Sequence, residues 1–173
     1  MKLVLLGYMG SGKSSIGKAL SQVTGVSFQD LDNFIEKKEG LSISALFETK
    51  GEIYFRRKEA ILLQQMLSEN RSLIIATGGG TPCYGNVMNE LLASKNVQTV
   101  YLKCSVDTLT ERLWKEKKNR PLIAHLNSKA LLNDFIRKHL FERSYYYNQA
   151  HLIINCDSFS EKELVEKIVL QLF

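Results

Sequence analysis

With 173 residues, of which 45% are hydrophobic and 24% charged, the chain has the size and composition of one globular domain with a buried core. Its formal net charge of +5, from 23 lysines and arginines against 18 aspartates and glutamates, suits an anionic partner and equally suits an ordinary solvated surface. The three cysteines, Cys83, Cys104 and Cys156, form no CxxC pair and have no histidine at metal-ligand spacing. This pattern excludes a disulfide framework or a zinc site and indicates reduced thiols in the cytoplasm.

Two short runs limit the partners that we expect. The basic residues Lys115, Lys117 and Lys118 form only a brief cluster without interleaved aromatic residues, which favours a small anionic molecule over nucleic acid. The apolar run Leu3–Leu6 ends at Gly7 and is too short for a signal peptide or a membrane span. We therefore expect a first strand there and no membrane partner.

Short apolar runs alternate with longer segments of helical spacing along the chain. The runs that predict buried strands are Leu3–Leu6, Leu73–Ala76, Val97–Leu102 and Leu152–Ile154, with a weaker fifth at Val26–Phe28. The predicted helices are Lys13–Val23, Ile53–Leu67, Val87–Ala93, Asp107–Trp114, Leu131–Tyr147 and Lys162–Leu172. Both prolines, Pro82 and Pro121, fall in predicted loops. The alternation predicts a single, doubly wound α/β unit with a parallel sheet.

Between the first strand and the first helix lies Gly7-x-x-x-x-Gly12-Lys13-Ser14, the pattern and the context of a P-loop. Its glycines allow the backbone N–H groups to face phosphates, while the Lys13 cation reaches the β and γ oxygens and the Ser14 hydroxyl binds Mg²⁺. The residues expected to bind ATP in this segment are Gly10, Ser11, Gly12, Lys13, Ser14 and Ser15. An accidental Gly-rich turn is the alternative, and the motif does not identify the acceptor.

The second strand is followed by two carboxylates, Asp30 and Asp32, at the edge of the sheet where open α/β proteins bind ligands. We assign Asp30 to the metal and Asp32 to the substrate, where it can accept a proton from an attacking hydroxyl. Capping of a helix that starts near Leu31 is the alternative for one of them. A calcium loop is excluded because Ile35 and Leu41 occupy its glycine and glutamate positions.

The second predicted helix carries adjacent arginines, Arg56 and Arg57, which point about 100° apart and so do not easily share a task. Arg56 suits bidentate binding of a carboxylate, and Glu59 three residues later can hold its guanidinium. A surface ion pair is the alternative. Gly78-Gly79-Gly80 follows the third strand and permits close approach of a ligand or of the P-loop to the backbone, or else forms a flexible turn.

Two further arginines lie in the second half of the chain. Arg120 belongs to a polar stretch, 115–125, that suits a mobile lid carrying a cation onto the transferred phosphoryl group. Arg143, on the following predicted helix, is a second candidate for binding a carboxylate. Solvated surface charge is the alternative for each of them.

The ordered set of P-loop, Asp30-x-Asp32, Phe55-Arg56-Arg57-x-Glu59, Gly78-Gly79-Gly80 and Arg120-Pro121-Leu122 closely resembles the shikimate kinase family over nearly the whole chain. The resemblance implies a P-loop NTPase fold with three α/β/α layers, a five-stranded parallel sheet and a lid, like that of nucleoside monophosphate kinases. It implies transfer of the γ-phosphoryl group of ATP to the 3-hydroxyl of shikimate, with Mg²⁺, in aromatic amino acid biosynthesis through chorismate. The substrate-binding segment would span about 31–59 and the lid about 112–125.

The resemblance also implies roles for single residues. Arg56 and Arg143 would bind the shikimate carboxylate, and Asp32 and Gly79 its ring hydroxyls, with Gly78 and Gly80 beside them. Lys13, Asp32 and Arg120 would be catalytic, with Asp32 orienting or deprotonating the acceptor hydroxyl and Arg120 contacting ATP phosphates. Arg112 would pack against adenine. Ala76-Thr77-Gly78 lacks the usual Walker B acid, so Ser14 and Asp30 would hold the metal.

One segment departs from the family pattern. Asn155 to Phe159, after the last predicted strand, lacks the Arg/Pro-type adenine wall of some members, so Phe159 or backbone groups would replace it. Another P-loop metabolite kinase, for gluconate or a nucleoside monophosphate, is the main rival, and a binding protein without turnover is another. A GTPase-like switch would need an Asn-Lys-x-Asp motif, which the sequence lacks. We expect a cytoplasmic monomer.

Overall fold

Five short strands form one parallel sheet at the centre of the molecule. The computed structural model describes residues 1–172. The strands are β1 (Lys2–Leu6), β2 (Ser27–Asp30), β3 (Leu73–Ala76), β4 (Val97–Lys103) and β5 (Leu152–Asn155). They lie in the order β2-β3-β1-β4-β5, and every neighbouring pair is parallel. The predicted fold class and sheet are confirmed.

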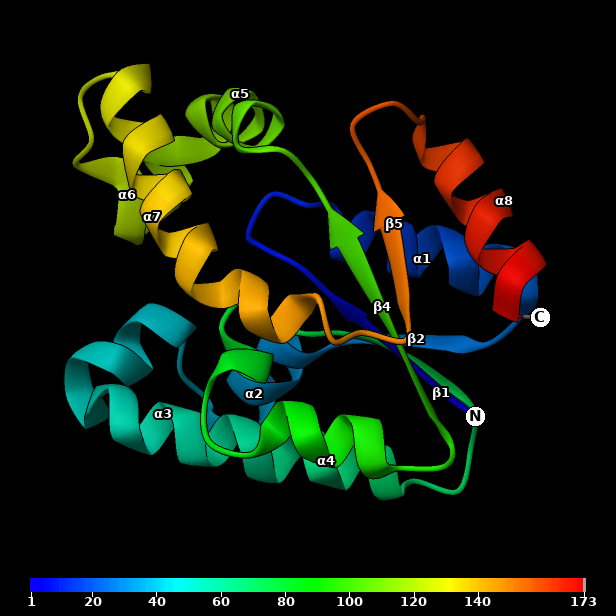
Figure 1. Cartoon of the computed structure of the whole chain (residues 1–173). Coiled ribbons are helices and arrows are strands. Elements are labelled where there is room, and N and C mark those ends of the chain that lie inside the picture. The colour runs from blue at the N-terminus through cyan, green and yellow to red at the C-terminus, as the bar shows by residue number, and fades with distance from the viewer. Residues whose placement is uncertain (173) are drawn as a thin grey trace.

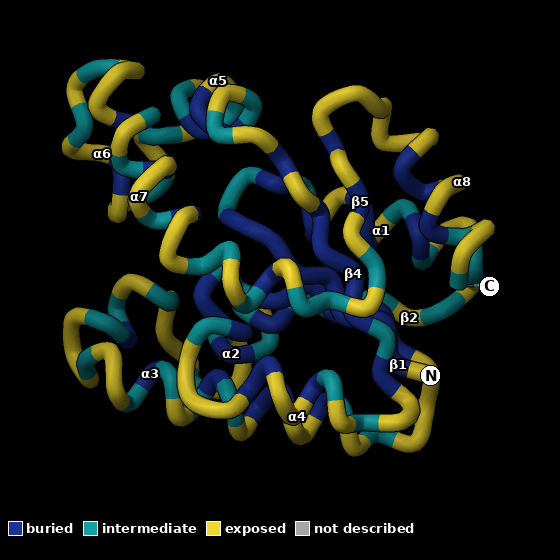
Figure 2. The backbone as a smooth tube through the Cα atoms, in the orientation of Figure 1, coloured by how far each residue is buried: buried dark blue, intermediate teal, exposed yellow. Residues whose placement is uncertain are grey.

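The central strand β1 is buried along its whole length, as are most residues of β3 and β4. Figure 2 shows this buried centre in dark blue, with exposed residues on the outer turns of the helices. Continuous apolar runs are typical of strands covered on both faces, because a parallel sheet needs crossover helices on each side. These strands are largely apolar because helices cover both faces of the sheet.

Helices cover both faces of the sheet (Figure 1). On one face α1 (Lys13–Thr24) packs beside α8 (Glu161–Leu172), while α3 (Ile43–Ser68) and α4 (Val87–Ala93) lie on the other. The helices that follow β1 and β3 thus leave neighbouring strands toward opposite faces. Open α/β sheets bind ligands at the carboxyl edge where this occurs.

The remaining helices gather near that carboxyl edge. They are α2 (Leu31–Glu39), α5 (Val106–Glu116), α6 (Pro121–Ala124) and α7 (Lys129–Tyr147), with the short 3-10 turns η1 (Thr81–Cys83) and η2 (Lys117–Asn119). Helix α2 packs on α3, and α5 packs on α7. Within residues 1–172, no helix is long and apolar enough to cross a membrane.

The structure corrects three local predictions. Helix α3 begins at Ile43 rather than Ile53, because Ser42 caps the Ala45 N–H group and a break at Gly51 (φ 79°) separates two helical limbs. Pro82 lies in η1 and Pro121 opens α6, rather than in loops. Proline is tolerated in a first helical turn, where its missing N–H group would have no partner. The weak fifth strand is Ser27–Asp30, so Asp30 ends the strand instead of following it.

One glycine brings α1 close to β2. A Cβ atom on Gly17 would lie 2.2 Å from the Phe28 ring, so only glycine fits this contact without movement. The close approach of helix and strand places Ser14, one turn before Gly17, beside Asp30 at the end of β2. The contact between Gly17 and Phe28, away from the carboxyl edge, therefore sets the distance between Ser14 and Asp30 at that edge.

Candidate functional site

The P-loop curls between β1 and α1 as its sequence predicts. Gly10 (φ 78°) and Gly12 (φ 93°) adopt the left-handed conformation that other residues avoid, and Gly12 leads directly into α1. The N-terminus of a helix carries free N–H groups and a partial positive charge, which together favour phosphate. Ser11 is buried within the loop, whereas Ser15 on the first turn of α1 is exposed.

Lys13 is held in the concave side of this loop. Its Nζ atom donates hydrogen bonds to the Gly7 carbonyl at 2.8 Å and the Tyr8 carbonyl at 2.9 Å. Burial lowers the pKa of Lys13 to about 8, while the carboxylates of Asp32 and Asp30 oppose this change. A buried cation with only neutral hydrogen-bond partners is well placed to interact with an anion.

Ser14 and Asp30 present oxygen atoms side by side. The Ser14 hydroxyl donates to Asp30 Oδ2 at 2.6 Å, and Asp30 Oδ1 accepts from the N–H groups of Asp32 and Asn33. Asp30 therefore caps α2 and contacts the P-loop serine at once, so capping does not exclude a metal role. A hydroxyl and a carboxylate fit Mg²⁺, which takes few protein ligands and keeps phosphates and water. Residues 1–172 contain no group of three or more His, Cys, Asp or Glu side chains that could bind a metal by themselves.

Asp32 lies in the first turn of α2, among other acids. Burial, with the nearby charges of Asp30 and Glu59, raises the pKa of its carboxyl group to about 6 against the opposing effect of Lys13. Ionising a carboxyl group away from water and beside like charges is unfavourable. Asp32 therefore titrates close to neutral pH, where proton transfer is useful.

The backbone of Gly78, Gly79 and Gly80 meets three different side chains. A Cβ atom on Gly78 would lie 3.0 Å from Asp32 Oδ1, and one on Gly80 would lie 2.8 Å from Arg56 Nη2. A Cβ atom on Gly79 would lie 3.2 Å from Arg143 Nη1 and 3.3 Å from the Met9 backbone nitrogen of the P-loop. The predicted close approach of the P-loop is confirmed at Gly79, and the three glycines gather an acid and two arginines around one loop.

Arg56 is anchored by Glu59, as its spacing predicts. Its Nη1 atom donates to Glu59 Oε2 at 2.9 Å, while Glu59 Oε1 accepts from the Thr81 hydroxyl at 2.6 Å. The guanidinium also lies 4.0 Å from the centre of the Tyr84 ring. The neighbouring Arg57 is exposed, so the two arginines do differ in their surroundings.

Arg143 reaches the same loop from α7 without such an anchor. None of the ion pairs within residues 1–172 involves it. Its guanidinium lies 5.7 Å from the centre of the Tyr8 ring, and its positive charge lowers the pKa of Cys83 against the larger effect of burial. A half-buried cation without a carboxylate partner in the chain favours binding of an external anion.

The two arginines of the predicted lid lie apart from the glycine loop. Arg120 is paired with Glu116, to which its Nη2 atom donates at 2.6 Å, yet its charge still lowers the pKa of Lys13. Arg112 on α5 donates to the Gly10 carbonyl at 3.1 Å and so borders the P-loop. Phe159 lies under the Lys167 ammonium group, 4.2 Å from its ring centre.

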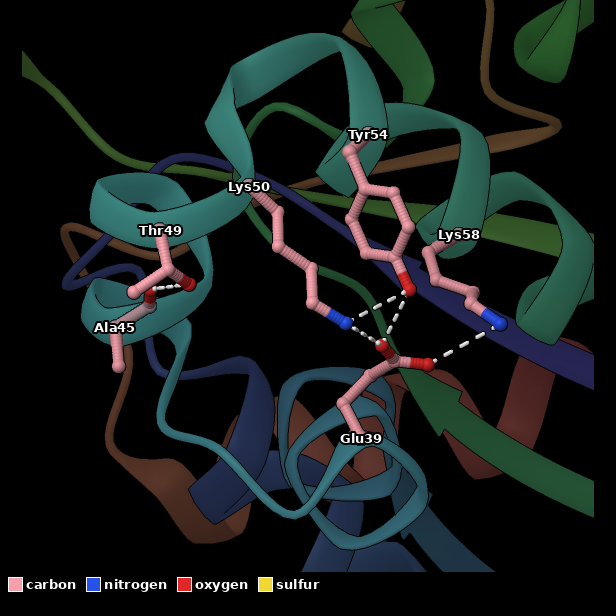
Figure 3. Close-up of polar contacts among 6 residues, drawn as sticks. All are labelled: Glu39, Ala45, Thr49, Lys50, Tyr54 and Lys58. Carbon is pink, nitrogen blue, oxygen red and sulfur yellow. Dashed lines mark hydrogen bonds and ion pairs between the residues drawn. The ribbon is translucent and has the colours of Figure 1, made fainter.

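A polar cluster joins the helices that carry Asp32 and Arg56. In Figure 3, Lys50, Tyr54 and Lys58 converge on the Glu39 carboxylate at the end of α2. Tyr54 donates to Glu39 Oε2 at 2.6 Å, while Lys50 and Lys58 lie 3.4 and 3.2 Å away. Since Lys50 precedes the break in α3 and the other two follow it, Glu39 ties both limbs to α2.

Several of these contacts join residues that no local sequence pattern relates. Glu39, Tyr84 and Tyr147 each contact a residue that is distant along the chain, Tyr147 through a hydrogen bond to the Gly79 carbonyl, so local spacing does not predict them. A pattern was nevertheless present in α7, where His139, Arg143 and Tyr147 recur every four residues and so share a face.

The comparisons with known proteins agree with one another. A family model described as shikimate kinase matches residues 9–173. A curated shikimate kinase of Flavobacterium johnsoniae is 47% identical over 97% of this chain and 96% of its own length. The crystal structure of shikimate kinase from Bacteroides thetaiotaomicron has a TM-score of 0.90 and 32% identity and covers 99% of both chains. Shikimate kinase from Acinetobacter baumannii, solved in complex with shikimate, has a TM-score of 0.84 and 31% identity over 99% of this chain and 92% of its own.

The buried charge of Asp32 makes a prediction about stability. Because its pKa is raised from 3.8 to about 6, ionised Asp32 costs folding free energy above pH 6, and this cost disappears as the pH falls toward 4. We expect Asp32→Asn to raise the free energy of unfolding by about 1–3 kcal/mol at pH 8, and by progressively less toward pH 4. Urea denaturation of both proteins across this pH range measures the difference.

Asp30→Ala is the matched control. Asp30 accepts the capping hydrogen bonds of α2, so its loss should destabilise the protein by about 1 kcal/mol. A stability gain of Asp32→Asn that does not change with pH would contradict the assigned cause.

Proposed function

The chain belongs to the shikimate kinase family, and we propose that the groups gathered around its P-loop and glycine loop carry out the family's reaction. The enzyme transfers a phosphoryl group from ATP to shikimate. The observation that supports our residue assignments most is the meeting of Asp32, Arg56 and Arg143 at Gly78–Gly80. An acid for a hydroxyl and two cations for a carboxylate suit a hydroxylated carboxylic acid.

On the nucleotide side, we assign the triphosphate to the P-loop residues Gly10 to Ser15. Their backbone N–H groups and the N-terminus of α1 would face the phosphates, and Lys13 would interact with the β and γ oxygens. Arg112 would border the nucleotide at the rim of the loop, which its hydrogen bond to Gly10 supports. Phe159 remains a candidate contact of the base.

Ser14 and Asp30 are the residues that would hold Mg²⁺. Their adjacent oxygen atoms support this assignment. When bound, the ion would offset charge on the β and γ phosphate oxygens.

On the acceptor side, Arg56 and Arg143 would bind the carboxylate of shikimate. Gly78, Gly79 and Gly80 would keep these groups close to the ring, since a Cβ atom at each would crowd Asp32, Arg143 or Arg56 at 3.0, 3.2 or 2.8 Å. Asp32 would then contact the 3-hydroxyl group. A pKa of about 6 leaves Asp32 ionised at neutral pH, although it remains a stronger base than an ordinary aspartate.

The chemical step follows from this arrangement. The acceptor oxygen attacks the γ-phosphorus while its proton passes to the Asp32 carboxylate, and the bond from the γ-phosphorus to the bridging oxygen of ADP breaks. Lys13 and Arg120 would offset negative charge on the transferred group. Correct orientation of the acceptor hydroxyl and the γ-phosphoryl group would supply much of the rate enhancement, and no covalent enzyme intermediate is needed.

We also propose that residues 1–173 form a single kinase domain in which 31–59 binds the substrate and 112–125 is the lid. Closure of the lid would bring Arg120 toward the P-loop and exclude water from the phosphoryl group. We place the enzyme in the cytoplasm as a monomer, and the free thiols of its three cysteines support a reducing compartment.

A comparison of acceptors tests the proposed function. Purified enzyme with ATP and Mg²⁺ should release ADP in the presence of shikimate and show only background release with gluconate or nucleoside monophosphates. A coupled spectrophotometric assay measures ADP with each acceptor. Preference for either of the other acceptors would overturn the proposal.

Arg56→Ala should weaken the use of shikimate. Loss of a charge-assisted contact costs about 1.5–3 kcal/mol, so we expect the KM for shikimate to rise about 10- to 100-fold. The KM for ATP should stay within about twofold, since the contact involves only the acceptor. The exposed neighbour gives the control Arg57→Ala, which should match the wild type. Equal losses for both substrates would argue against a carboxylate contact.

Asp32→Asn should remove the proton acceptor while leaving nucleotide binding intact. We expect kcat to fall at least about 100-fold. In the wild-type enzyme, kcat/KM for shikimate should rise with pH through about 6, as Asp32 loses its proton. Steady-state kinetics from pH 5 to 8, with nucleotide binding measured by calorimetry, check both points. Wild-type turnover in Asp32→Asn would remove Asp32 from the chemistry.

A further inference from the structure

Helix α7 presents a row of three side chains toward the two loops of the site. His139, Arg143 and Tyr147 are spaced four residues apart, so they lie on one face of the helix. In Figure 1, α7 (amber) runs from the lid region back toward the strands. Arg143 occupies the middle of the row and has a neighbour one turn away on each side.

The first neighbour joins α7 to the P-loop. The Tyr8 hydroxyl lies 2.9 Å from His139 Nδ1, and the two rings meet edge to face with their centres 5.5 Å apart. Burial raises the pKa of Tyr8 and lowers the pKa of His139, so the phenol keeps its proton and the imidazole is neutral at neutral pH. The tautomer of His139 sets which of the two groups donates. Tyr8 is only 1% exposed, which protects this bond from water.

The second neighbour joins α7 to the glycine loop. The Tyr147 hydroxyl donates a hydrogen bond to the Gly79 carbonyl. Tyr147 is fully buried, and its ring packs 5.0 Å from the ring of Tyr101 on β4. The same residue, Gly79, is the one whose missing side chain leaves room for Arg143.

Arg143 thus lies between the P-loop and the glycine loop, and its own helix is hydrogen-bonded to both of them. Its guanidinium lies over the Tyr8 ring and beside Gly79. Unlike Arg56, it has no carboxylate among residues 1–172 within ion-pair distance to orient it. A long, flexible side chain without such a partner loses rotamer entropy when it binds a ligand. Fixed positions of Tyr8 and Gly79 on either side of the arginine reduce that loss of rotamer entropy.

We propose that the Tyr8–His139 and Tyr147–Gly79 hydrogen bonds are the positioning elements of Arg143, which set it to receive the acceptor's carboxylate. This inference rests on the proposed function of Arg143. Tyr8 and Tyr147 do not contact the reacting atoms and act through the arginine.

Tyr8 has a second contact on the nucleotide side. Its backbone carbonyl accepts a hydrogen bond from Lys13 at 2.9 Å, while its side chain bonds α7. One P-loop residue thereby contacts the lysine assigned to ATP and supports the arginine assigned to shikimate. Because the two contacts use different atoms, removal of the hydroxyl should affect only the acceptor side.

Tyr8→Phe and Tyr147→Phe test the inference, since each removes one hydroxyl and keeps the ring. Loss of a buried hydrogen bond weakens the equilibrium that it supports about fivefold, so we expect the KM for shikimate to rise about fivefold in each variant. The KM for ATP should stay within about twofold. Tyr145→Phe is the matched control, because Tyr145 lies on the same helix, is 73% exposed and should behave as the wild type.

A double-mutant cycle separates positioning from a general structural role. In an Arg143→Ala background, Tyr8→Phe should raise the KM for shikimate by less than about twofold, because the residue that it supports is absent. An equal rise in both backgrounds would show that Tyr8 acts independently of Arg143 and would overturn the inference. A rise in the KM for ATP equal to that for shikimate would overturn it as well.

The outcomes also distinguish this inference from the function on which it rests. If Arg143→Ala leaves the KM for shikimate unchanged, the carboxylate role of Arg143 fails, and the inference fails with it. If Arg143→Ala raises this KM but the phenylalanine variants do not, only the inference fails. Thermal denaturation of each variant checks folding. Should Tyr8→Phe fold poorly, His139→Phe removes the other partner of the same bond and carries the same expectation.

Discussion

The space beside the backbone of Gly78, Gly79 and Gly80 is the constraint on which the rest of the site depends. Groups from three helices occupy it: Asp32 from α2, Arg56 from α3 and Arg143 from α7. A methyl group at any of these glycines would crowd one of them, at 2.8 Å for Arg56 and at 3.0 and 3.2 Å for Asp32 and Arg143. The loop follows β3 directly, and β3 lies next to β1, so the sheet places this convergence beside the P-loop.

Burial brings the pKa values of Lys13 and Asp32 closer together. It lowers the pKa of Lys13 to about 8 and raises that of Asp32 to about 6, although each group favours the charged form of the other. Removing charged groups from water costs free energy, and pKa values shifted in this way are common at functional sites. Proteins commonly sacrifice stability at such positions for activity.

The two arginines that we assign to the acceptor side have different surroundings. Arg56 depends on an ion pair with Glu59, which Thr81 supports in turn. Arg143 has no such ion pair and lies near the Tyr8 ring, while its helix is hydrogen-bonded to the P-loop and to the glycine loop. A cation that is already paired gives rigid geometry, whereas an unpaired one keeps its charge for a ligand. The combination suits recognition of one carboxylate from two directions.

Features set by short stretches of sequence could be predicted. The five strands follow from runs of apolar residues, the P-loop from its glycine, lysine and serine spacing, and the Arg56–Glu59 pair from positions three apart on one helix. The prediction of a helix from Ile53 missed the first limb of α3, which begins at Ile43 and is separated from the second by the break at Gly51. The order of the motifs also indicated the family, which the comparisons confirmed.

Only the tertiary structure decided which distant residues meet. Tyr8 and His139 are separated by 131 positions and Tyr147 and Gly79 by 68, so no periodicity relates them. The convergence of Lys50, Tyr54 and Lys58 on Glu39 depends on how α2 packs against α3. The pKa of Asp32 likewise depends on burial and on charges that other elements bring close. A sequence determines the chemistry available at each position, but the packing of the chain determines which groups share a space and how strongly water screens them.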